Sequence, residues 1–126
     1  MKYMCILLAS LFITSCASGP EAVAKSSKEL AKCLINKDST IPQSNKKTAL
    51  EKDYKKIDDF KQKLKANCNE EEIKKVLKLT NCQVKECKKS STIKANSVAT
   101  WGEKCSNELN IDLKKEFTDN CFKLVN

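Results

Sequence analysis

The sequence predicts an all-α fold, a small disulfide-stapled bundle of four to five helices. The chain of 126 residues contains only two Gly and two Pro. Its apolar residues recur at helical spacing, and no sustained alternation indicates a strand. Six cysteines follow an apolar N-terminal segment, an even number that is typical of a short secreted chain with three disulfides. The predicted disulfide cysteines are Cys33, Cys68, Cys82, Cys87, Cys105 and Cys121.

Residues 1–17 are predicted to be a signal peptide that is cut after Ala17. Lys2 supplies a positive charge, and the apolar run at 5–13 is too short to span a bilayer. Residues 12–16 also resemble a bacterial lipobox, in which Cys16 would carry a lipid anchor. We favour the signal peptide because six downstream cysteines are typical of small secreted domains. Residues 18–126 then form a single helical disulfide-rich domain.

The composition excludes several classes of activity. The chain carries 24 Lys, no Arg and no His. Without His there is no Ser/His or Cys/His catalysis and no His-based zinc site. Without Arg, recognition of nucleic acid is disfavoured. The carboxylate runs at 58–59 and 70–72 are interpreted as a solvated helix face and a helix N-terminus. We therefore expect no enzyme, no cofactor and no metal.

The first helix is expected over 21–36, after Pro20, and a loop follows at 38–45. A second helix should begin at a capping box formed by Thr48 and Glu51. Its core-facing stripe contains Leu50, Tyr54, Ile57, Phe60, Leu64 and Cys68, which lie within an arc of about 120°.

Asn69 and Glu72 predict a capping box at the start of the third helix. Cys82 falls on the side opposite the apolar residues of this helix, so a break is expected near 80–81. After a loop at 88–97, a capping box of Thr100 and Glu103 should begin a helix that aligns Trp101, Cys105 and Leu109. The last helix is expected to carry Leu113, Phe117, Cys121 and Leu124.

Helix lengths limit which cysteines can pair. The second and third helices are each about 30 Å long and are joined with almost no loop, so they should form an antiparallel hairpin with Cys68 at its tip. Cys33 lies near the open end, too far from Cys68 for a disulfide, which needs Cα atoms within about 7 Å. Cys33 is then within reach of Cys82 or Cys87, and Cys68 within reach of Cys105 or Cys121. Among these pairings we favour Cys33 with Cys87, Cys68 with Cys121, and Cys82 with Cys105.

These features predict a secreted, non-enzymatic, basic binding protein of the venom-toxin or host-directed effector type. It would dock a Lys-rich helical face on an acidic extracellular target, such as a channel or receptor, or on an anionic membrane surface. We expect it to be a monomer and to bind no nucleic acid. The candidate contacts are Lys55, Lys56, Lys63 and Lys74.

Three alternatives stay open. The first is a secreted carrier of a small hydrophobic ligand, which needs a cavity of about 300 Å³ or more. Its cup would be lined by Leu50, Tyr54, Ile57, Phe60, Trp101 and Phe117. The second is a membrane-active antimicrobial protein that binds anionic vesicles. The third is a bacterial lipoprotein anchored at Cys16.

Processing provides the first test. We expect the intact mass of the mature protein to correspond to a chain that begins near Ser18, with no free thiol and no lipid. Mass spectrometry before and after alkylation measures both properties. A diacylglyceryl group on Cys16 would contradict the secreted interpretation and establish the lipoprotein.

Overall fold

The computed structural model describes residues 19–126, so the predicted signal peptide and Cys16 lie outside the described residues. The described chain is all-α, which confirms the predicted fold class. Its elements are α2 (Pro20–Lys37), the 3-10 turn η2 (Gln43–Asn45), α3 (Lys46–Asn67), α4 (Glu70–Lys89), α5 (Ser97–Glu108), α6 (Leu113–Glu116) and α7 (Asp119–Val125). Between residues 19 and 126, no helix has the length and apolar character needed to cross a membrane.

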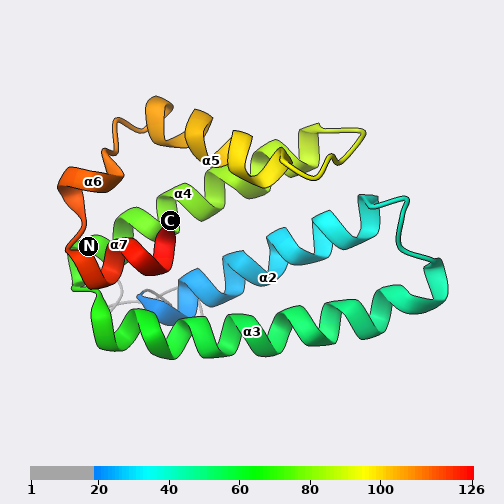
Figure 1. Cartoon of the computed structure of the whole chain (residues 1–126), viewed down its shortest axis with the longest axis horizontal. Helices are drawn as coiled ribbons and strands as arrows, with labels where there is room; N and C mark the ends of the chain where they lie inside the picture. The colour runs from blue at the N-terminus through cyan, green and yellow to red at the C-terminus, as the bar shows by residue number, and fades with distance from the viewer. Residues whose placement is uncertain (1–18) are drawn as a thin grey trace, which may run out of the picture.

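Three long helices form the body of the molecule. α3 and α4 diverge from the corner at Cys68, and α2 lies between them and packs along both (Figure 1). α5 packs on α4, and α7 packs on α3 near the corner. The core residues come from every layer and include Val23, Leu64, Ile73, Val76, Leu79, Ile111 and Phe117. The stripe of α3 is fully buried only near the corner, at Leu64 and Cys68, because the start of the helix extends past the other elements.

One of the three predicted capping boxes is confirmed. The Asn69 side chain accepts from the backbone N–H of Glu72, and the Glu72 carboxylate accepts from the backbone N–H of Asn69, both at 2.8 Å. The boxes at Thr48 and Thr100 are wrong, because α3 begins at Lys46 and α5 at Ser97. The turn η2 leads directly into α3, so the backbone of α3 is already helical before Thr48.

The expected break near 80–81 is also wrong, because α4 continues without interruption to Lys89. Cys82 does face away from the apolar stripe, but α5 covers that side of the helix. The C-terminal helix, in contrast, is divided in two. Phe117 is extended (φ −125°, ψ 137°) and buried, and Thr118 is the N-cap of α7. Burial of the Phe117 ring ends α6 after one turn.

All three predicted disulfides are confirmed. Their Cα–Cα distances are 6.3 Å for Cys33–Cys87, 4.9 Å for Cys68–Cys121 and 5.9 Å for Cys82–Cys105. The first joins the ends of α2 and α4, the second ties α7 to the corner, and the third fixes α5 on α4. Each bond therefore joins elements that are distant in sequence. Three disulfides of this kind are typical of a protein that folds in an oxidising compartment.

Lysine side chains from neighbouring helices cap two of the helix C-termini. Lys37 Nζ donates to the backbone carbonyls of Cys87 (2.5 Å), Lys88 (3.0 Å) and Ser90 (2.7 Å). Lys46 Nζ donates to the carbonyl of Asn36 at 2.8 Å. A cation at this position satisfies unpaired carbonyls and opposes the negative end of the helix dipole. The open end of the bundle is thus held by charge as well as by Cys33–Cys87.

Reduction of the disulfides should largely unfold the protein. Each disulfide contributes about 2–4 kcal/mol, and their sum is comparable with the whole net stability of a small domain. Far-UV circular dichroism and the thermal midpoint, before and after reduction and alkylation, measure the effect. If helicity and midpoint were the same in both forms, the disulfides would not hold the fold.

Candidate functional site

The four lysines predicted to contact a partner are all exposed, but they do not lie on one face. Lys55, Lys56 and Lys63 lie on α3, and Lys74 lies on α4. At 100° per residue, Lys56 and Lys63 are about 20° apart on α3, whereas Lys55 is about 100° from Lys56. A partner that touches Lys56 and Lys63 would therefore meet Lys55 only at its edge.

The surface of α3 carries charges of both signs. Its exposed lysines alternate with three exposed acids, Glu51, Asp58 and Asp59. Asp58 pairs at 2.9 Å with Lys28 of α2, and the ammonium of Lys28 lies 5.4 Å from the centre of the Tyr54 ring. The Lys28 ammonium donates to Asp58 and keeps the pKa of that carboxyl below its ordinary value. The α3 surface is therefore a mixed and partly neutralised one.

The exposed side of α4 has a different character. From Lys74 to Lys89, every exposed charged residue of this helix is a lysine, and the one other exposed residue is Asn81. The five lysines lie within an arc of about 100° and extend along about 22 Å of the helix. We call this set the α4 lysine stripe; it consists of Lys74, Lys78, Lys85, Lys88 and Lys89.

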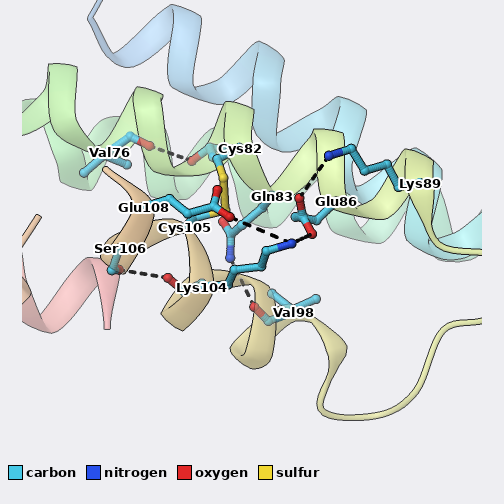
Figure 2. Close-up of a disulfide and its surroundings, with 12 residues drawn as sticks. Val76, Cys82, Gln83, Glu86, Lys89, Val98, Lys104, Cys105, Ser106 and Glu108 are labelled. Atoms are coloured by element: carbon cyan, nitrogen blue, oxygen red, sulfur yellow. Dashed lines mark hydrogen bonds and ion pairs between the residues drawn. A yellow bond between two sulfur atoms is a disulfide. The ribbon is translucent and has the colours of Figure 1, made fainter. Parts of the chain in front are cut away.

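Between Lys74 and Lys89, the one acid of α4 is directed away from the stripe. Glu86 is 9% exposed and lies toward α5, where its carboxylate meets the Lys104 ammonium at 2.8 Å (Figure 2). The hydrogen bond from Lys104 lowers the pKa of Glu86, against the effect of burial. Lys89 approaches the same carboxylate at 3.7 Å, and Lys74 approaches Glu71 at 3.5 Å.

Three of the five lysines of the α4 lysine stripe are without an ion-pair partner in the described chain. Lys78, Lys85 and Lys88 form no ion pair with any residue in the described part of the chain. α2 and α5 pack against other sides of α4, and the lysines stand on a side that no other described helix covers.

Compared with models of protein families, with curated proteins and with solved structures, the chain matches none. Any statement about function therefore depends on the residues and geometry of this molecule.

A second cluster of residues, at the corner, has the spacing of a metal site but holds the fold together instead. The sulfurs of Cys68 and Cys121 and a carboxylate oxygen of Glu72 lie within 4.8 Å of one another. Both sulfurs belong to one disulfide, so neither is the thiolate that a metal ion would need. Glu72 is 3% exposed and accepts from the backbone N–H of Asn69 at 2.8 Å and of Thr118 at 2.5 Å.

The charge of Glu72 is stabilised by these bonds. Burial raises the pKa of Glu72, but the backbone donors at Asn69 and Thr118 outweigh it and hold the pKa below its ordinary value. Beside Glu72, an ion pair between Lys75 and Glu116 at 3.1 Å joins α4 to α6. Glu72 thus connects the first turn of α4 to the N-cap of α7.

The structure also contains a cleft whose position was not predicted from the sequence. A cleft of about 1140 Å³ lies beside α4, between α5 on one side and α2 with α3 on the other. Of the six residues expected to line a carrier's cup, only Phe60 is in its wall. We call this hollow the α4–α5 cleft; it is lined by Leu30, Phe60, Leu79, Gln83, Val98, Ala99, Gly102, Ser106, Phe122 and Val125, among others.

Replacing Glu72 by Gln should lower stability by about 1–3 kcal/mol, because one buried backbone N–H loses its acceptor. The stabilisation by Glu72 should be complete above its unfolded-state pKa of about 4.3 and lost as pH falls through the lower folded-state pKa. The gap in thermal midpoint between wild type and E72Q should therefore shrink below pH 4.

Thermal melts from pH 7 to pH 2 measure this gap, and Glu29→Gln, at an exposed glutamate on α2, is the control. A gap that stayed constant across the pH range would show that the charge of Glu72 has no part in holding the corner.

Proposed function

We propose that this chain is a secreted, non-enzymatic, basic binding protein of the venom-toxin or host-directed effector type. It docks the α4 lysine stripe on an acidic extracellular protein such as a channel or receptor. The observation that carries the proposal is the stripe itself, a line of five exposed lysines with no exposed acid among them. The stripe includes Lys74 and replaces the other three lysines expected from the sequence as the main contact.

α4 is held rigidly, which makes the stripe suitable for binding a partner. Two disulfides end on this helix, at Cys82 and Cys87, and a capping box fixes its first turn. The backbone that carries the lysines is therefore already ordered, so binding loses less conformational entropy. A dense row of like charges also attracts an acidic partner from a distance and raises the association rate, most strongly at low ionic strength.

An acidic protein surface suits the stripe better than a membrane does. Helices that bind membranes combine a basic face with large apolar residues that enter the lipid. The stripe and its surroundings on α4 expose no large apolar side chain, and Val98 and Leu109, the exposed ones in the described chain, belong to α5 and the residue after it. The contact is therefore expected to be polar, peripheral and sensitive to salt.

Charge reversal on two helices provides a matched test. Lys74, Lys78 and Lys85 have the same sequence spacing as Lys52, Lys56 and Lys63 of α3, and all six are exposed. The variants K74E/K78E/K85E and K52E/K56E/K63E therefore have equal net charge and equal charge spacing. The probe is a fluorescent deca-glutamate peptide, whose binding is followed by anisotropy at 50 and 300 mM NaCl.

We expect the α4 variant to bind at least about tenfold more weakly at 50 mM NaCl, since three contacts of about 0.5 kcal/mol each are lost. The α3 variant should stay within about threefold of wild type, and all binding should weaken at 300 mM NaCl. An equal loss in both variants would mean that net charge alone governs binding, and would refute the α4 lysine stripe as the contact.

A further inference from the structure

The α4–α5 cleft lies on the opposite side of α4 from the lysine stripe. Its floor is formed by Val76, Leu79, Thr80 and Gln83 of α4. One wall comes from small residues of α5, and the facing wall comes from Ser27 and Leu30 of α2 with Phe60 of α3. α7 closes one end with Phe122 and Val125.

Disulfide Cys82–Cys105 keeps the α5 wall in place. Cys105 and Trp101 face α4 and are buried, which leaves Val98, Ala99, Gly102 and Ser106 toward the cleft. The Gln83 amide crosses from α4 and donates to the carbonyl of Val98 at 3.2 Å (Figure 2). Because a covalent bond and a hydrogen bond fix this wall, the cleft exists before any ligand enters it, as in most small-molecule sites.

The small residues of α5 create the open space. A Cβ atom placed on Gly102 would lie 3.2 Å from Nε2 of Gln83, so even alanine there would press on the amide that holds the wall. Ala99 is exposed and lines the cleft. Larger side chains at either position would fill the cleft from the α5 side.

The lining of the cleft is almost uncharged, although the rest of the surface is rich in lysine. Among the 24 lysines of the chain, Lys114 alone is in the lining, together with the acids Glu103 and Asp112. The Asp112 carboxylate already accepts from the backbone N–H groups of Lys114 and Lys115. More than half of the lining is apolar, and most of the remainder carries hydroxyl or amide groups, at Ser27, Thr80, Gln83, Ser106, Asn107 and Asn110.

We propose that the α4–α5 cleft binds an uncharged amphiphile with a single apolar chain and a hydroxyl or ester head, of the long-chain alcohol or monoacylglycerol class. The apolar floor takes the chain, and the hydroxyl and amide groups take the head. A carboxylate or phosphate head would meet two acids of the lining, Glu103 and Asp112, against the single cation Lys114, which disfavours an anionic head. The volume of about 1140 Å³ is ample for one such molecule.

A helical peptide does not suit this cleft. Protein partners need a broad exposed apolar patch, whereas Val98 is the only exposed large apolar residue of the lining. Leu30, Phe60 and Phe122 are half-buried, and Leu79 is 9% exposed. These side chains therefore offer a helical partner little exposed apolar area to cover.

Displacement of a neutral fluorophore tests the proposal. The probe is N-phenyl-1-naphthylamine, which becomes bright in an apolar site. Competitors are glycerol monolaurate, dodecanoate and dodecylamine, all below their critical micelle concentrations, so that only the head differs. We expect wild type to bind the probe and glycerol monolaurate to displace it at about tenfold lower concentration than either charged competitor.

Tryptophan substitutions at two alanines locate the site. Ala99→Trp fills the cleft, and Ala66→Trp adds the same side chain at an exposed alanine of α3 outside the lining. Probe binding should weaken at least tenfold in A99W and stay within twofold of wild type in A66W. In wild-type protein, amide shifts on adding glycerol monolaurate should centre on Gly102 and Leu79, which gives a readout that needs no variant.

The proposal is overturned if the probe does not bind, if the three competitors act equally or dodecanoate acts best, if A99W binds like wild type, or if the shifts lie elsewhere. Binding of an amphipathic helical peptide in place of the amphiphile would also overturn it. The inference does not depend on the proposed function, because K74E/K78E/K85E should bind the fluorophore like wild type. The two proposals can therefore fail separately.

Discussion

The carboxylate of Glu72 is the contact on which the arrangement of this molecule depends. α3 ends at Asn67 and α4 begins at Glu70, so two residues must turn the chain. Glu72 makes the turn possible by accepting the N–H of Asn69, and it draws in Thr118 with its other oxygen. The Cys68–Cys121 disulfide lies against the same carboxylate. One buried anion thereby sets the direction of α4 and the position of α7, which closes one end of the cleft.

The lysines of this chain have two distinct uses. Lys37 and Lys46 cap helix ends, while Lys28, Lys75 and Lys104 pair with acids of neighbouring helices. These side chains hold helices together, and their charge is balanced inside the fold. The unpaired lysines of α4 have no such role, so their repulsion is uncompensated within the described chain. A uniform solvated surface would be expected to mix the signs of charge, as α3 does, and α4 departs from that pattern between Lys74 and Lys89.

The sequence predicted the fold class from the helical spacing of its apolar residues. Distance along the chain excluded a Cys33–Cys68 disulfide and left few partners for each of these cysteines. The rise of a helix fixes how far Cys33 lies from Cys68, and the near absence of a loop at the corner fixes the reversal. Asn69 and Glu72 were predictable for the same reason, since the capping box involves only neighbouring residues. The starts of α3 and α5 were not, because Thr48 and Thr100 suit a cap and equally suit a first helical turn. In α5, Thr100 Oγ1 donates back to the Asn96 carbonyl.

The two proposed sites depend on tertiary packing and were not predictable from local patterns. Cys82, on the polar side of α4, indicated a break in the helix, because the local sequence does not reveal that α5 covers that side. For the same reason the sequence could not separate the lysines of α4 from those of α3. Recognising the stripe required knowing that Glu86 turns inward to Lys104, and recognising the cleft required the placement of α5.

α4 serves the two proposed sites through opposite sides of one helix. Its lysines face solvent on one side, and Leu79 and Gln83 form the floor of the cleft on the other. Coupling between two sites requires an element with two arrangements that both ligands bias. α4 is held by two disulfides, a capping box and the lysine cap from Lys37, so it is the least suited of the helices to such a change. An acidic partner on the stripe and an amphiphile in the cleft should therefore bind independently, and a net effect of one on the other would have to arise from α5 or α7.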